Sequence, residues 1–165
     1  MKKLPLFLLL LPLTAHAALS LFGAKPEEEK QWIENESALP AFPASHNLIP
    51  FEVSPVTRNK HYVDVTSISV AKDDVVRYTV IVEAPSGAKN ISFEGMRCDT
   101  GERRIYAYGH ADGTWSPAKN TSWQEINFIS SFSYQKVLYE EFFCPPGNYA
   151  KTAAEAVMNL RRAGR

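Results

Sequence analysis

Four successive segments between residues 61 and 111 alternate apolar and polar side chains with a period of two. They are rich in Val, Ile, Tyr, Phe and Thr, which favour strands, and the short turn sequences KDD, PSGAK and DTG separate them. The segments are residues 61–70, 74–85, 89–98 and 102–111. They predict an antiparallel β-meander of about four to five strands. In the second segment, Val76 and Tyr78 should face the core, while Arg77 and Thr79 should lie on a partly wet face.

The chain downstream of these strands has helical periodicity. Residues 126–143 place mostly apolar side chains at helical spacing and predict a helix that stops at Cys144-Pro145. A second helix should open at Thr152, where Glu155 completes a capping box. Strands followed by helices predict an α+β fold, with the C-terminal helices packed on one face of the sheet.

The first 17 residues have the pattern of a secretory signal peptide. Two lysines precede an apolar run, and Ala15 and Ala17 have the spacing that signal peptidase accepts. We therefore predict cleavage after Ala17 and export to the periplasm. The apolar run is shorter than the roughly 20 residues of a membrane-spanning helix, so we expect no integral membrane segment in the mature chain.

The formal charge of the chain argues against one class of partner. The chain has 18 basic and 18 acidic residues, and removal of the leader takes away Lys2 and Lys3. The slightly acidic remainder argues against nucleic acid, because phosphate binding needs a concentrated basic surface. We expect no cofactor and no metal, because the scattered histidines lack zinc-ligand spacing and there is no phosphate-binding glycine loop.

The mature chain has about 150 residues, the usual size of a single domain. Residues 18–55 are predicted to form a short helix, over residues 25–35, and then a Pro-rich strap. Prolines at positions 40, 43, 50 and 55 keep the strap extended. The strap should lie across the sheet and cover it, and an exposed Pro-rich ligand is the alternative. Residues 56–165 form the remainder of the single α+β domain.

Two cysteines, Cys98 and Cys144, are predicted to form a disulfide, because exported proteins fold in an oxidising compartment. Two free buried thiols are the alternative. If Thr100-Gly101 is a two-residue hairpin turn, side chains of the two flanking strands alternate between faces. Cys98 should then share the helix-facing side with Met96, Ile105 and Ala107.

The same register puts Arg97 directly opposite Arg104 on the other face, and such a like-charge pair calls for a nearby anion. An internal carboxylate of Asp64, Glu94, Asp99 or Glu102 could supply it. Alternatively, this face forms a shallow site for a carboxylate or phosphate group, held by bidentate hydrogen bonds from arginine. The candidate ligand-binding residues are Arg97, Arg104, Tyr106, Tyr108 and His110.

His110 and Asp112 also suggest a catalytic base and its orienting carboxylate. The alternative is that they mark the end of a strand and a turn before Gly113. Two hypotheses for the function therefore stay open. One is a non-catalytic binding or assembly accessory, whose partner is an envelope protein or a small anionic ligand. The other is a hydrolase or transferase that acts on an anionic substrate through His110 and Asp112, with Arg97 and Arg104.

Two blocks, SFEGMRC at residues 92–98 and YAYGHADGTWSPA at residues 106–118, carry a resemblance. With LPAFP, LIPF and the late FFCPPG, they make residues 31–147 resemble the cryptic neisserial protein family of small exported bacterial proteins. The resemblance implies a periplasmic or cell-envelope location and no particular activity. Many relatives look like lipoproteins, but Ala18 rather than a cysteine follows the predicted cleavage site here, so we expect no lipid anchor.

Overall fold

The computed structural model of the protein describes residues 31–131 and 133–163. The predicted leader, its cleavage site after Ala17 and residues 18–30 lie outside the described residues. From Trp32 onward, the chain clusters as one unit. Residues 32–35, at the end of the helix predicted over 25–35, contain no helix.

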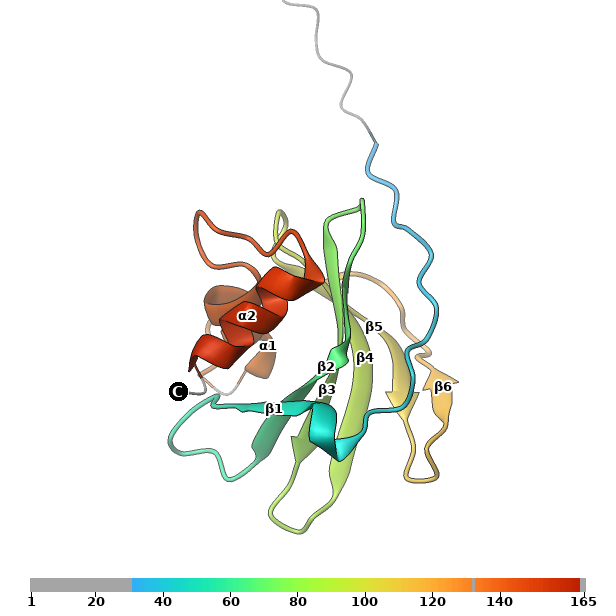
Figure 1. Cartoon of the computed structure of the whole chain (residues 1–165), viewed down its shortest axis with the longest axis vertical. Coiled ribbons are helices and arrows are strands. Elements are labelled where there is room, and N and C mark those ends of the chain that lie inside the picture. The colour runs from blue at the N-terminus through green and yellow to red at the C-terminus, as the bar shows by residue number, and fades with distance from the viewer. Residues whose placement is uncertain (1–30, 132, 164–165) are drawn as a thin grey trace, which may run out of the picture. The chain divides into compact units, whose positions relative to one another are not determined.

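Within the described residues, seven strands form one antiparallel sheet (Figure 1). Six of them lie side by side in chain order, and the seventh joins the outer edge of β5. The strands are β1 (Leu48–Phe51), β2 (Lys60–Val70), β3 (Val75–Glu83), β4 (Lys89–Arg97), β5 (Glu102–Gly109), β6 (Trp115–Pro117) and β7 (Gln124–Glu125). The predicted antiparallel meander is confirmed, and it has more strands than the four to five expected.

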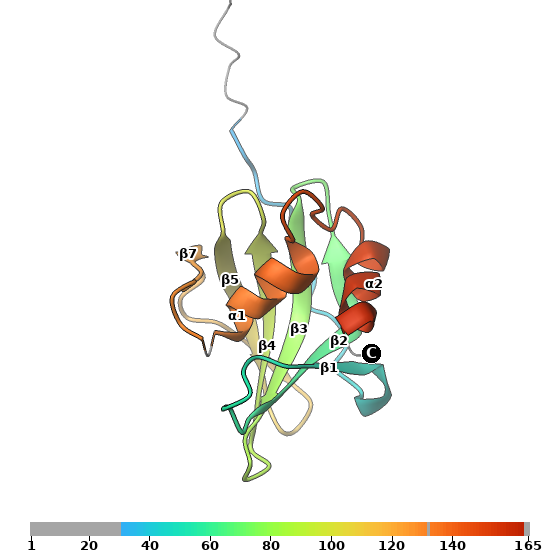
Figure 2. The ribbon, with the colours of Figure 1, turned by 90° about the vertical axis from the view of Figure 1, so that its left-hand side faces the viewer.

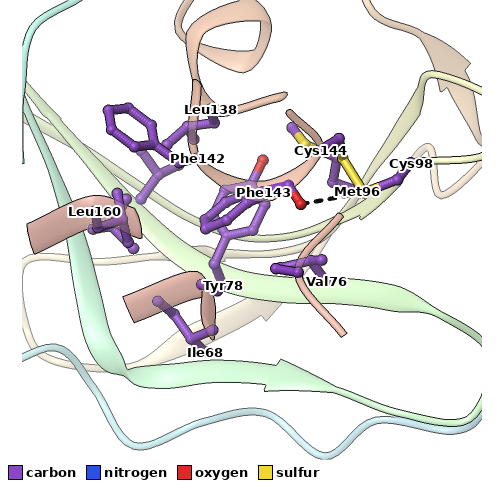
Figure 3. Close-up of a cluster of buried hydrophobic side chains, with 14 of the residues drawn as sticks. Ile68, Val76, Tyr78, Met96, Cys98, Leu138, Phe142, Phe143, Cys144 and Leu160 are labelled. Atoms are coloured by element: carbon purple, nitrogen blue, oxygen red, sulfur yellow. Dashed lines mark hydrogen bonds between the residues drawn. A yellow bond between two sulfur atoms is a disulfide. The ribbon is translucent and has the colours of Figure 1, made fainter. Parts of the chain in front are cut away.

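The helices cover one face of this sheet, which confirms the predicted α+β arrangement (Figure 2). The helical elements are a 3-10 turn (Ser45–Asn47), α1 (Tyr134–Val137), a π-helix (Leu138–Phe143) that continues α1, and α2 (Ala153–Ala163). Figure 3 shows the core between the two layers, where side chains of β2, β3 and β4 meet those of the helices. Its buried members include Ile68, Val76, Tyr78, Met96, Leu138, Phe142, Phe143 and Leu160. Burial of each large apolar side chain stabilises the fold by about 1.5–3 kcal/mol.

The first helix begins later than predicted, at Tyr134 rather than near residue 126. The side-chain oxygen of Asn127 accepts hydrogen bonds from two backbone N–H groups that follow it, and this local turn competes with helix formation. Ser133 then caps α1 by accepting a hydrogen bond from a backbone N–H of the first turn. Ile129, predicted on the apolar helix face, is consequently 97% exposed.

The second helix starts as the capping box predicts. Thr152 Oγ1 accepts a hydrogen bond from the Glu155 N–H at 3.2 Å. The Glu155 carboxylate in turn accepts one from the Lys151 N–H at 2.7 Å, one residue earlier than in the usual box.

A disulfide joins Cys98, directly after β4, to Cys144, directly after the π-helix (Figure 3). Both cysteines are buried in the same cluster as Met96. The predicted pairing is confirmed, and so is the prediction that this face of the hairpin meets the helices.

The hairpin between β4 and β5 has a different register from the predicted one. Its loop spans residues 98–101 instead of two residues, so Arg97 pairs with Glu102 and Gly95 pairs with Arg104. The predicted like-charge pair of Arg97 and Arg104 is therefore wrong. Each of these β5 residues pairs with a β4 residue two positions away from the predicted one. Because the shift is even, Arg97 and Arg104 still share the face opposite the helices.

A bulge changes the faces of the residues beyond it. The pairing of β4 with β5 shifts between Phe93 and Glu94, and as a result Ala107 lies opposite Phe93 and Tyr108 lies opposite Ser92. An extra residue in one strand reverses which side chains face which way. Tyr108 is thus on the helix side of the sheet and Ala107 on the other, the reverse of the prediction.

The face opposite the helices is also buried at its centre, because an irregular segment lies across it (Figure 1). Arg77 is only 1% exposed and Thr79 is fully buried, so the partly wet face predicted for this strand is wrong. We call residues 32–44 the docked segment and the sheet face beneath it the docked face. The predicted strap is not one continuous irregular segment. After the docked segment, Leu48–Phe51 pair with β2 and form an edge strand of the sheet.

Candidate functional site

The docked segment is anchored by separate side-chain contacts. Trp32 Nε1 donates a hydrogen bond to the backbone oxygen of Asp73 at 3.0 Å. Trp115 Nε1 donates to the backbone oxygen of Pro40 at 3.1 Å, and the Trp115 ring packs against Phe42 with 5.4 Å between ring centroids. Within the described part of the chain, the segment contributes no strand to the sheet. Its attachment therefore depends on a few side chains.

The carboxylate of Glu34 in this segment is surrounded by hydrogen-bond donors. Its Oε1 accepts from the Tyr106 hydroxyl at 2.7 Å, and its Oε2 accepts from Trp123 Nε1 at 3.1 Å and from Arg104 Nη1. Arg77 Nη2 lies 3.7 Å from Oε1. We call Arg77, Arg104, Tyr106 and Trp123 the carboxylate site. Two guanidinium groups, a phenol and an indole N–H form a strong receptor for one carboxylate.

Three elements position these donors. Arg77 belongs to β3, Arg104 and Tyr106 lie two residues apart on β5, and Trp123 immediately precedes β7. Residues two apart on a strand point to the same face, so both β5 side chains reach Glu34. Gly95 of β4 makes room for Tyr106, because a Cβ atom there would overlap the Tyr106 ring. The sequence thus builds the site with a glycine beneath an aromatic ring.

Arg77 is held by a buried ion pair. Its Nη2 lies 2.6 Å from Asp73 Oδ2 and its Nη1 lies 3.2 Å from Asp73 Oδ1. Burial acts to raise the pKa of Asp73, but the hydrogen bonds from Arg77 and from two backbone N–H groups outweigh it, so this pKa lies below its usual value. The Asp73 carboxylate therefore stays ionised and keeps the Arg77 guanidinium in place.

The hydrogen-bond donors of the carboxylate site keep their protons. Burial raises the pKa of Tyr106 well above its usual value, and the hydrogen bond to Glu34 adds to this increase. The phenol therefore remains a donor at physiological pH, and arginine side chains keep their charge in proteins. What this arrangement can do chemically is hold an anion.

Arg97 lies on the docked face but does not touch Glu34 in the described structure. Its guanidinium carbon lies 3.9 Å from the centroid of the Trp32 ring. It also forms ion pairs with Asp99 at 3.0 Å and with Glu102 at 3.1 Å. For Arg97, then, two of the internal carboxylates named from the sequence supply the neighbouring anion.

The other two predicted ligand-binding residues lie elsewhere. Tyr108 is on the helix side of the sheet and 45% exposed. His110 is exposed and lines a groove of about 540 Å³ with Phe42 and Ile91, and this groove contains neither Arg97 nor Arg104. The structure therefore brings together Arg104 and Tyr106, but not the whole predicted set.

Asp112 belongs to a turn. It accepts hydrogen bonds from the Thr114 N–H at 3.0 Å and the Thr114 hydroxyl at 2.7 Å, and these bonds lower its pKa. Within the described residues, no hydrogen bond joins Asp112 to His110. His110 and Asp112 are thus arranged as the end of a strand and a turn, and not as a hydrogen-bonded catalytic pair.

A buried carboxylate also lies on the helix side of the sheet. Glu94 is fully buried and accepts hydrogen bonds from Ser92 Oγ at 2.6 Å, the Tyr134 hydroxyl at 2.7 Å and the Tyr78 hydroxyl at 3.2 Å. Burial raises the pKa of both Tyr78 and Tyr134, and the Glu94 charge raises it further. These hydroxyls satisfy Glu94 and tie α1 to β3 and β4. Because Glu94 is on the opposite face, it does not compensate Arg97 or Arg104.

His61 lines a second groove, with a volume of about 840 Å³, between the segment that follows β1 and the π-helix. The side chain is 5% exposed and its ring packs against Phe51, with 5.6 Å between centroids. Burial lowers the pKa of His61, so its imidazole is neutral near pH 7. From the sequence, His61 was considered only as one of the scattered histidines that lack zinc-ligand spacing.

Three members of the carboxylate arrangement were also missed: Glu34, Arg77 and Trp123. Glu34 and Arg104 are 70 positions apart, and no local spacing links them. Arg77 could have been suspected only as a charged residue in the middle of an otherwise apolar strand.

Within the described residues, no group of three or more His, Cys, Asp and Glu side chains could hold a metal ion. No helix in this part of the chain is long and apolar enough to cross a membrane.

Comparison with known proteins identifies a family. The family model described as the CNP1-like family matches residues 27–161, which is most of the chain. No curated protein and no solved structure matches the chain. The match supports the resemblance noted from the sequence at the level of a family of uncharacterised function, and it does not extend to a neisserial origin.

Proposed function

This chain belongs to the CNP1-like family, and we propose that it acts as a non-catalytic binding accessory of the periplasm or cell envelope. The carboxylate site would bind an anionic group of a ligand or partner protein in place of Glu34. One observation carries this proposal: the sheet and its loops supply every donor, whereas the carboxylate comes from the docked segment.

The charges of the site support binding of an external anion. Arg77 has Asp73 as a permanent partner, but Glu34 is the only ion-pair partner of Arg104 within the described residues. If Glu34 left, a partly buried guanidinium would remain beside two unused neutral donors. Leaving such groups unpaired costs free energy, so another anion should replace the carboxylate.

The location in the periplasm or envelope is supported by two features. The predicted leader has the composition of an export signal, and the disulfide between Cys98 and Cys144 is of the kind that persists in oxidising compartments.

The first test is to remove the internal competitor. We expect Glu34→Gln to let small dicarboxylates or anionic cell-wall fragments raise the melting temperature, since ligands that bind only the native state stabilise it. The wild type should respond more weakly because Glu34 competes, with an apparent affinity lower by about tenfold. Glu36→Gln, at an exposed site two residues along, should behave as the wild type.

Arg104→Ala in the Glu34→Gln chain gives the second half of the test. Its melting temperature should stay within a few degrees of the parent, and the response to anions should vanish. If no anion stabilises Glu34→Gln, or if Arg104→Ala responds equally, the carboxylate site is a structural clamp and the proposal is wrong.

A further inference from the structure

The docked face holds an indole ring beside the carboxylate site. The Trp32 ring lies under the Arg97 guanidinium and meets the edge of Trp123, with 5.9 Å between ring centroids and 81° between ring planes. Its N–H donates to the backbone oxygen of Asp73. Cation–π and edge-to-face contacts, together with a hydrogen bond at the polar end, are how proteins recognise an amphipathic aromatic side chain.

The docked face also binds the peptide backbone. The N–H of Asn35 donates to Asp73 Oδ2 at 2.8 Å, and the carbonyl oxygen of Asn35 accepts from Arg77 Nη2 at 2.9 Å. The buried ion pair of Asp73 and Arg77 therefore presents one acceptor and one donor to a single residue of a peptide. A simple dicarboxylate such as glutarate has no N–H group to donate to Asp73 and cannot use this pair of hydrogen bonds.

These contacts follow the spacing of an extended chain. The side chains of Trp32 and Glu34 contact groups of the docked face, although Trp32 is still 36% exposed, while Ile33 between them is 77% exposed. Alternation with a period of two is the geometry of an extended peptide. The docked face thus binds an aromatic ring, an acidic side chain two residues later, and the backbone of the residue that follows.

We propose that the docked face is a peptide-binding surface for an extended acidic segment of another protein, with an aromatic residue two positions before a glutamate or aspartate. In the isolated chain, residues 32–35 occupy this surface as an internal substitute for the partner. This inference rests on the proposed function of the carboxylate site and names the class of its ligand. Exchange of segments between two copies of the chain would replace each contact with an identical one and gain no new contact, whereas a segment of a different protein can add contacts of its own, so the proposal commits to a different protein.

A tethered segment competes strongly with an external one, because its effective concentration is of the order of millimolar. The test therefore uses the full chain with Trp32→Ala and Glu34→Gln, which remove the indole and carboxylate contacts of the docked segment. We call this double variant the emptied chain. Its ligand is a peptide of residues 31–38, QWIENESA, with blocked ends, and binding is measured by isothermal titration calorimetry. We expect this peptide to bind at least about tenfold more tightly than glutarate, which offers carboxylates alone.

Matched changes in the peptide and the chain make the result specific. Peptides with Trp32→Ala or Glu34→Gln should each bind at least about tenfold more weakly. In the emptied chain, Arg97→Ala should weaken the peptide but leave glutarate unchanged, because Arg97 contacts the Trp32 indole of the docked segment, whereas the Glu34 carboxylate is held by other side chains. Arg104→Ala should abolish binding of both, and Lys119→Ala, at an exposed position, should affect neither.

The outcomes separate this inference from the proposed function. If glutarate binds as tightly as the peptide, the anion site stands and the peptide surface is wrong; if neither binds, both are wrong. Self-association of the wild-type chain through residues 32–35, seen by sedimentation and lost in the emptied chain, would overturn the choice of a different protein. Should the emptied chain fail to fold, Glu34→Gln alone is titrated with the same peptides, and absence of binding there also contradicts the inference.

Discussion

Arg77 shows how one buried charge organises its neighbourhood. It is 1% exposed, and Asp73 is its closest ionised partner. We expect Asp73→Asn to lower the free energy of unfolding by about 3 kcal/mol, because it removes the closest counter-charge of a buried guanidinium and leaves it only the more distant Glu34 carboxylate, at 3.7 Å. Urea denaturation at pH 7 measures this change. The same experiment on Asp74→Asn gives the control, because the ion pair of the Asp74 side chain with Lys151 is exposed, and it should change stability by less than about 0.5 kcal/mol.

The sign of the pH dependence follows from the lowered pKa of Asp73. The stabilisation is fully present above the ordinary value of 3.8 and is lost as the pH falls through the lower folded value. Asp73→Asn should therefore lose this part of the acid sensitivity. Equal losses of stability in Asp73→Asn and Asp74→Asn would show that the ion pair contributes nothing.

His61 should make stability depend on pH in a different range. Burial holds its folded pKa below the unfolded value of 6.5, so between the two values the unfolded chain binds a proton that the folded chain does not. The free energy of unfolding should therefore fall as the pH drops below about 6.5. His61→Phe should flatten this slope, and His46→Phe, at an exposed position, should retain it. The slope is measured by denaturation at a series of pH values, and its persistence in His61→Phe would contradict the assignment.

At the scale of elements, Gly95 of β4 and Tyr106 of β5 are coupled. A Cβ at position 95 would overlap the Tyr106 ring, so Gly95→Ala should destabilise the chain by about 1–3 kcal/mol and displace the hydroxyl from Glu34. In a Tyr106→Ala background the same substitution should cost less than about 0.5 kcal/mol. A double-mutant cycle measures the coupling, and additive effects would mean that the two residues do not compete for space.

The four central strands β2–β5 and the two C-terminal helical segments could be predicted from the sequence, because alternation, helical periodicity and turn residues are local signals. The exact hairpin register could not, since loop 98–101 and the bulge near Phe93 both depend on how the strands pack. The start of α1 was missed because Asn127 forms a turn inside a helical pattern. Arg104 and Tyr106 of the predicted set do lie together around one carboxylate, while their binding of an external anion stays a prediction. Its occupant, Glu34, lies 70 residues earlier than Arg104, and only the three-dimensional fold reveals it.

At the scale of the whole molecule, the disulfide fastens the helical layer to the sheet. It closes a loop between cysteines 46 positions apart, which corresponds to roughly 4 kcal/mol of stability in the chain-entropy model. We expect the double variant Cys98→Ala/Cys144→Ala to lose a stability of this order, measured by urea denaturation. Reductant should lower the stability of the wild type and leave the double variant unchanged. A wild type that is unaffected by complete reduction would contradict this role.

The distribution of tryptophan gives the molecule a built-in optical reporter. The chain has three tryptophans, Trp32, Trp115 and Trp123, and each contacts either the docked segment or its partners on the docked face. The core beneath the helices instead contains phenylalanine and tyrosine. Intrinsic fluorescence excited at the indole band therefore monitors one side of the sheet. A ligand that displaces residues 32–35 must change the emission, whereas events confined to the helical side should leave it nearly constant.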